Sequence, residues 1–135
     1  MRRGRLALVS SALPALVAAG AAGARPQAHA ATVKLGASAN KTTIHPAVGD
    51  SVVIVLADCL DCGDRWIASP AKRALRPASA TYQDARLPKG QVGGIGKAFF
   101  RFKVHTGGGL VLLEYQGPAG STRYLKEFKL TIAPR

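Results

Sequence analysis

The chain has 135 residues, of which 47% are hydrophobic and 19% are charged. This length accommodates one domain of ordinary size, and the hydrophobic content is sufficient for a core, which argues against disorder. Two cysteines are too few for a disulfide-dense scaffold or for a zinc site of four thiolates from one chain. The formal net charge of +12 is compatible with an anionic partner. The basic residues are scattered, however, and no stacking aromatics lie among them, so we expect no nucleic-acid partner.

The first thirty residues have the pattern of an export signal. A basic start is followed by an apolar stretch over residues 6–22, and the segment ends in Ala-His-Ala at 28–30. Pro14 and Gly20 interrupt the apolar stretch and Gly23 follows it, which makes a permanent membrane span the poorer interpretation. We expect a signal peptide over residues 1–30 and a mature domain over 31–135. This domain would be secreted or periplasmic (extracytoplasmic) and would have no membrane anchor.

The mature chain reads as short strands separated by turn residues. In chain order, strands are expected at residues 33–37, 51–56, 65–69, 74–82, 100–105, 110–115 and 128–132. Apolar and basic residues alternate most clearly over 100–105, the pattern of a half-buried strand. The nearly continuous apolar run 110–115 fits a central strand that is covered on both faces. These features predict an all-β fold, an immunoglobulin-like antiparallel β-sandwich of about seven strands, in which Trp66 fills the core.

Three expected loops carry a resemblance to a known family. The first consists of Cys59, Leu60, Asp61, Cys62 and Gly63, with Trp66 three residues later. The second contains Gly93, Gly94, Ile95 and Gly96, and the third contains Gln116, Gly117 and Pro118. In the order and spacing of these loops, roughly residues 49–132 resemble the chagasin-like inhibitors of papain-type cysteine peptidases.

The resemblance implies a fold and a function. The three loops would lie at one end of the sandwich, enter the active-site cleft of a papain-like cysteine peptidase and block it without being cut. The twelve loop residues would then be the peptidase-binding residues, and Trp66 would be structural. We expect a monomer with no cofactor and no metal. The sequence has no His-Glu-x-x-His, phosphate-loop or nucleophile-elbow motif, which also predicts that the protein is not an enzyme.

The loops depart from the family pattern at several positions. Residues 59–62 replace Asn-Pro-Thr-Thr, Ile95 stands where an inner glycine is usual, and Gly117 and Ala119 replace the arginine and tryptophan of Arg-Pro-Trp. Large anchors of this kind commonly dominate interface energy. The alternative is therefore a secreted β-sandwich binding module with degenerate inhibitory loops, which binds a metal or another protein through the Cys59–Cys62 loop.

The cysteine pair has three interpretations. A local disulfide between Cys59 and Cys62 would stiffen the loop after export, and this is the favoured one. A redox pair of the thioredoxin kind needs a helix N-terminus, whereas this pair lies between strands and among carboxylates. A metal site would combine the two thiolates with Asp58, Asp61 or Asp64.

Overall fold

The structure is a computed structural model that describes residues 29–59, 62–91, 93–118 and 124–135. The expected signal peptide lies outside these residues, apart from its last two positions. The described elements are β1 (Thr32–Leu35), the 3₁₀ helix η1 (Ala37–Ala39), β2 (Thr42–Ile44), β3 (Ser51–Asp58), β4 (Arg65–Ala68), β5 (Ser79–Gln83), β6 (Gly96–Lys103), β7 (Gly109–Gln116) and β8 (Tyr124–Ile132). None of the helices in this part of the chain is long and apolar enough to cross a membrane.

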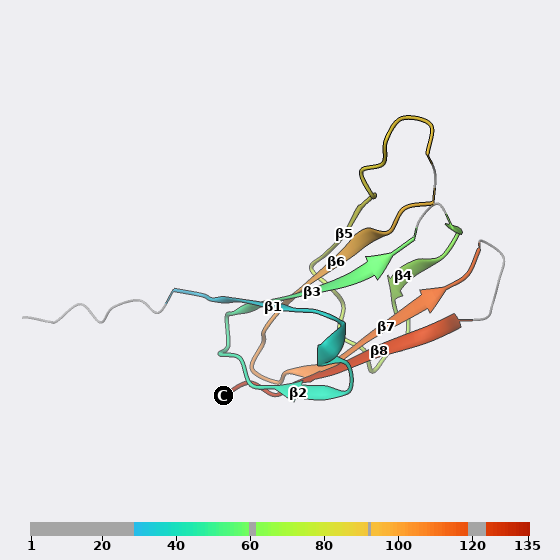
Figure 1. Cartoon of the computed structure of the whole chain (residues 1–135). Coiled ribbons are helices and arrows are strands. Elements are labelled where there is room, and N and C mark those ends of the chain that lie inside the picture. The colour runs from blue at the N-terminus through green and yellow to red at the C-terminus, as the bar shows by residue number, and fades with distance from the viewer. Residues whose placement is uncertain (1–28, 60–61, 92, 119–123) are drawn as a thin grey trace, which may run out of the picture.

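The strands form two four-stranded sheets that face each other. One sheet has the order β1-β3-β6-β5 and the other has the order β2-β8-β7-β4 (Figure 1). The predicted β-sandwich is therefore confirmed, with eight described strands instead of about seven. The prediction of a fully antiparallel sandwich is wrong at one edge of each sheet, because β1 pairs with β3 in parallel and β2 pairs with β8 in parallel.

The core lies between the inner faces of the two sheets. Every second residue of each long strand points inward, which is the geometry of a pleated strand. Strands β3 and β6 contribute Val52, Ile54, Leu56, Ala98, Phe100 and Phe102, and strands β7 and β8 contribute Val111, Leu113, Tyr115, Phe128, Leu130 and Ile132. The alternation predicted over 100–105 is confirmed, since Phe100, Phe102 and Val104 are buried whereas Arg101 and Lys103 are exposed. Leu112 is also buried, on the outer side of β7, in agreement with a strand that is covered on both faces.

Two parts of the predicted strand pattern are wrong. Strand β2 was not expected, because three residues are too few to show a periodic pattern. The strand is held by pairing with β8, about ninety residues later. The strand expected at 74–82 begins only at Ser79. Pro77 has no N–H to donate to a neighbouring strand, and in residues 74–78 only Ala74 forms a bridge, with Leu110.

Candidate functional site

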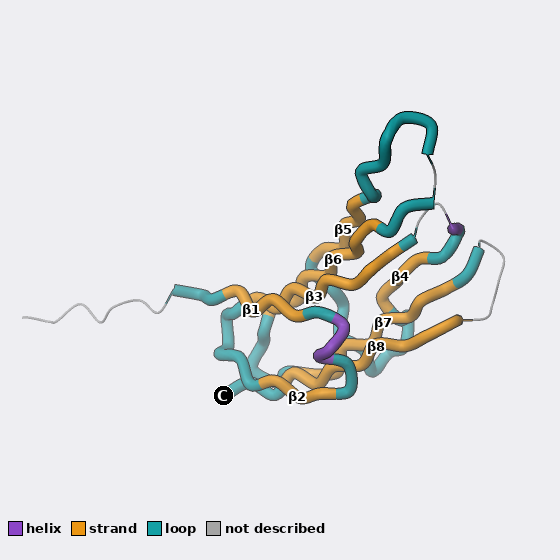
Figure 2. Tube along the Cα trace, in the orientation of Figure 1, coloured by secondary structure: helices purple, strands orange, loops and turns teal. Residues whose placement is uncertain are grey.

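The three loops singled out in the sequence lie at the same end of the sandwich. Strand β3 runs into the first loop, strands β5 and β6 are joined by residues 84–95, and β7 runs into the third loop (Figures 1 and 2). This end lies opposite the C-terminus, and the β5–β6 loop extends furthest from the sheets (Figure 1). We call the described loop residues 59, 62–63, 93–96 and 116–118 the rim. Leu60 and Asp61, also predicted site residues, lie outside the described residues.

The first loop is closed by a disulfide bond between Cys59 and Cys62, with their Cα atoms 5.2 Å apart. The amide of Cys62 also donates a hydrogen bond to the carbonyl oxygen of Cys59 at 3.1 Å. The predicted disulfide is confirmed. It removes the thiolates that a metal site at this loop would need, and the described chain contains no group of three or more residues able to hold a metal ion.

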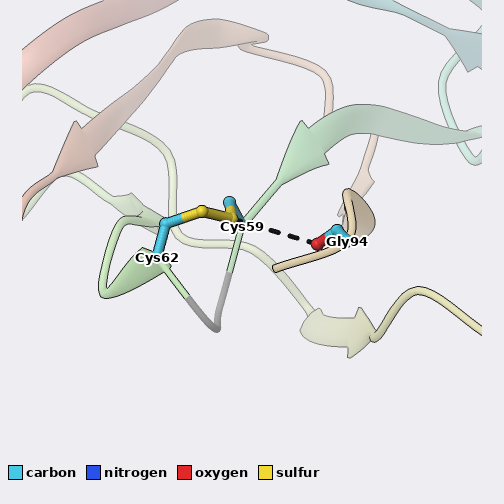
Figure 3. The surroundings of a disulfide bond; sticks show 3 residues. All are labelled: Cys59, Cys62 and Gly94. Carbon is cyan, nitrogen blue, oxygen red and sulfur yellow. Dashed lines mark hydrogen bonds between the residues drawn. A yellow bond between two sulfur atoms is a disulfide. The ribbon is translucent and has the colours of Figure 1, made fainter. Parts of the chain in front are cut away.

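The disulfide packs against the glycine-rich second loop. The Sγ atom of Cys59 lies 3.9 Å from the carbonyl oxygen of Gly94 (Figure 3). A disulfide sulfur carries no proton, so this is a packing contact between the two loops. Cys59 is buried by this contact and its neighbours, whereas Cys62 is exposed.

The first loop also touches the third. Gly63 has a φ of 80°, a left-handed conformation that glycine adopts without strain. A Cβ atom added to Gly63 would lie 3.2 Å from Cγ of Pro118. Gly63 therefore allows both the turn and the close approach of Pro118, and the first loop is the one that joins the other two.

The third loop leaves β7 at an irregularity in the sheet. The register between β7 and β8 shifts between Tyr115 and Gln116, which is how a bulge redirects the end of a strand. Gln116 donates a side-chain hydrogen bond to Glu114 at 3.3 Å, and Gly117 and Pro118 follow it toward the first loop. All the described residues of the three predicted loops are thus brought to one end.

The β5–β6 loop contributes residues that the sequence analysis missed. A Cβ atom on Gly94 would lie 2.5 Å from Cβ of Ala85 and 2.8 Å from Cδ2 of Leu87. The limb 84–88 therefore packs directly against the glycine-rich limb. Between the two tightly packed glycines, Ile95 keeps 72% of its surface exposed. The Pro-Lys-Gly turn at 88–90, which precedes the glycines, was the sequence signal for a hairpin with two limbs.

Trp66 ties the two sheets together beneath the rim. Its indole N–H donates to the carbonyl oxygen of Ala57 at 2.9 Å, and its amide donates to the carboxylate of Asp58 at 3.0 Å. Its carbonyl oxygen accepts a hydrogen bond from the hydroxyl of Tyr82 at 2.7 Å. Trp66 is on β4, whereas all three partners are on the other sheet. The roles of Asp58 and Tyr82 were not predicted, because they depend on contacts between residues of different strands.

Aromatic and charged groups surround this tryptophan. Its ring lies 5.1 Å from that of Tyr115, and the guanidinium of Arg65 lies 3.8 Å from the centre of the Tyr82 ring. Burial raises the pKa of Tyr82, an effect that Arg65 opposes and Asp58 reinforces. Burial also raises the pKa of Tyr115, with further contributions from Asp64 and Asp58. Both phenols therefore stay neutral at physiological pH. The ring contacts of Trp66 with Tyr115 and of Arg65 with Tyr82 pack the base of the rim.

No protein-family model and no curated protein matches the chain. Several solved structures match it. EhICP2 from Entamoeba histolytica, described as a cysteine protease inhibitor, is 20% identical with a TM-score of 0.65, over 80% of this chain and 99% of that one. Amebosin is 24% identical with a TM-score of 0.61, over 77% and 98%. PbICP-C, solved in complex with falcipain-2, is 14% identical with a TM-score of 0.50, over 77% and 98%. The chain therefore has the chagasin-type fold that the resemblance predicted.

Proposed function

We propose that the protein inhibits papain-like cysteine peptidases by placing the rim in their active-site cleft. The observation that carries the proposal is the convergence of three loops, which are distant in sequence, on one end of the sandwich. Cys59 touches Gly94, and Gly63 is in close contact with Pro118. The likeness to EhICP2, a cysteine protease inhibitor, and to PbICP-C in complex with falcipain-2 supports this function.

The rim is built to bind without large rearrangement. The disulfide closes the first loop, close contacts fix the second and third against it, and Trp66 joins the sheets below. A binding surface that is already ordered loses little conformational entropy on association. An extended substrate strand must fit the catalytic groups to be cut, whereas tightly packed turns present no such strand. The protein would thus block the cleft by occupancy and not by catalysis of its own.

The protein would act outside the cytoplasm as a monomer. Two features support export: the signal-like pattern of residues 1–30 and the disulfide, since disulfides persist in oxidising compartments. Mass spectrometry of protein recovered from an exporting host would show a chain beginning at Ala31. Retention of the first thirty residues would contradict the proposed export.

Inhibition of papain by the purified protein tests the proposal. We expect competitive inhibition at sub-micromolar concentration, with the inhibitor uncut after long incubation. Pro118→Asp places a charge on the rim and should weaken inhibition, because the carboxylate would lose hydration in the complex. The matched control is Val48→Asp. Val48 is exposed and precedes β3, whereas the first loop of the rim follows the end of β3. Strand β3, whose eight residues span about 27 Å, lies between Val48 and the first loop of the rim.

The alternative of a binding module with degenerate inhibitory loops keeps one observation in its favour. The third loop has Gly117 beside Pro118, with no arginine or tryptophan anchor. A folded protein that leaves papain fully active at tens of micromolar would favour this alternative, with another protein as the ligand of the rim. Its metal-binding form is contradicted by the disulfide between Cys59 and Cys62.

A further inference from the structure

Ile95 is the most exposed of the large apolar side chains in the described part of the chain. It is 72% exposed, compared with 51% for Val48 and 37% for Leu87. In the following strand β6, by comparison, Ala98, Phe100 and Phe102 are buried and Phe99 is partly buried. Ile95 also precedes β6 in the β5–β6 loop, which extends furthest from the sandwich (Figure 1). Its aliphatic surface is therefore available to a partner.

The backbone on both sides of Ile95 is held in place. Gly94 lies so close to Ala85 and Leu87 that a Cβ atom would be 2.5 Å and 2.8 Å from their side chains. A Cβ atom on Gly96 would overlap the carbonyl oxygen of Gln83. The contact of Gly94 with Cys59 links this segment to the disulfide as well. Isoleucine is branched at Cβ, so few side-chain rotamers remain to be lost on binding.

The side chain stands beside a hollow and does not fill it. The hollow lies between the two limbs of the loop and is lined by Gln83, Asp84, Ala85, Arg86, Ile95, Gly96 and Lys97. An isoleucine that served the fold would pack into such a space and lose most of its exposure. Ile95 is one of the lining residues of this open hollow and still keeps 72% of its surface exposed, so the fold does not bury it.

We propose that Ile95 inserts into an apolar substrate-binding pocket of the target peptidase and selects targets whose pocket accepts a branched aliphatic side chain. This inference rests on the proposed function and adds its specificity determinant. Burial of the isoleucine side chain supplies affinity, and the fixed backbone around it keeps the cost of ordering small. A pocket of limited size would also exclude larger side chains. This size limit distinguishes insertion into a pocket from non-specific hydrophobic association.

Inhibition constants of Ile95 variants against papain test the proposal. Ile95→Val should change the constant by less than about fivefold, because one methylene is lost. Ile95→Ala should weaken inhibition roughly 10- to 50-fold and Ile95→Asp more strongly. Ile95→Trp should also weaken inhibition, since the indole side chain would be larger than the pocket. The matched controls Val48→Ala and Val48→Asp, at the far end of β3, should leave the constant unchanged, and all the variants should melt like the wild type.

Each other outcome has a definite meaning. Wild-type inhibition with no effect of Ile95→Ala overturns the role of Ile95 and leaves the proposed function standing. Tighter inhibition by Ile95→Trp overturns insertion into a bounded pocket. A dimer that Ile95→Asp dissociates, measured by size-exclusion chromatography with light scattering, would make a second copy of the chain the partner. Absence of inhibition by the wild type overturns the proposed function and this inference together.

Discussion

Trp66 makes three hydrogen bonds to the opposite sheet, and each uses a different group: the indole N–H, the amide and the carbonyl oxygen. Its ring also packs on Tyr115 in the core. A single residue thus fixes the distance between the sheets directly below the rim. The hydroxyl of Tyr82 is the partner that can be removed without changing the shape of the core.

Tyr82→Phe is expected to lower the free energy of unfolding by about 1 kcal/mol, because the carbonyl oxygen of Trp66 loses its donor. Denaturation by urea measures the change. Thr81→Val is the matched control, since it removes a hydroxyl from an exposed residue of the same strand and should have little effect. Equal stability of Tyr82→Phe and the wild type would contradict the role of this hydrogen bond.

The raised pKa values of Tyr82 and Tyr115 predict a loss of stability at alkaline pH. Burial raises both above the ordinary value of 10.0, so the folded state holds these protons more tightly than the unfolded state. The resulting stability is fully present below pH 10.0 and is lost as the pH rises through the folded pKa values. Melting temperatures between pH 8 and 11 should fall above 10.0 and should fall less for Tyr82→Phe. Parallel curves for the two proteins would contradict this linkage.

Among the elements, the β5–β6 hairpin depends on the absence of a side chain at Gly94 and Gly96. Gly96 does not have a left-handed φ, so its constraint is steric and comes from the carbonyl oxygen of Gln83. Gly96→Ala should therefore cost about 1–3 kcal/mol of stability and separate the two limbs. The melting temperature should fall, and inhibition of papain should weaken. Gly107→Ala is the control, because a Cβ atom there meets no atom within 4 Å. Unchanged inhibition by Gly96→Ala would show that the hairpin geometry is dispensable.

The disulfide-closed loop is the second element with a separable role. Replacing both Cys59 and Cys62 by serine should cost about 2 kcal/mol in the chain-entropy account, since the closed ring is short. The sandwich should remain folded, because its core lies between the sheets and not in this loop. Inhibition should weaken more than stability alone explains, since the loop loses its preformed shape. Circular dichroism and the inhibition constant measure the two effects, and an unaltered constant would contradict this role of the disulfide.

The accuracy of sequence-based prediction differed between the strands and the loops. Strands β6 and β7 were predictable because apolar residues recur every second position or run continuously there. Strand β2 was not, since its place is set by pairing with β8 and not by its own three residues. The positions of the loop residues were predicted from the resemblance. The contacts of Gly63 with Pro118 and of Cys59 with Gly94 were not, because they join residues 55 and 35 positions apart, which no local pattern encodes.

At the scale of the whole molecule, the two sheets act as a rigid support. They place three loops at one end, whereas Val48, the start of β3 and the C-terminus lie at the other. The TM-score of 0.65 to EhICP2 at only twenty per cent identity shows that the same fold is kept although most residues differ. Of the large apolar side chains in the described part of the chain, Ile95 on this rim is the most exposed. Under the proposed function, a few rim residues on this shared scaffold would set the specificity.

Protection of the catalytic thiol of papain tests the central claim most directly. Both cysteines of the chain are joined in the disulfide, so they do not consume an alkylating reagent. Papain is treated with iodoacetamide in the presence of the purified protein, and the rate of alkylation is followed by mass spectrometry. We predict that alkylation slows in proportion to the papain that is bound, equally for the wild type and for Val48→Asp and less for Pro118→Asp. An unchanged rate of alkylation at saturating concentrations of the folded protein would contradict occupation of the cleft by the rim.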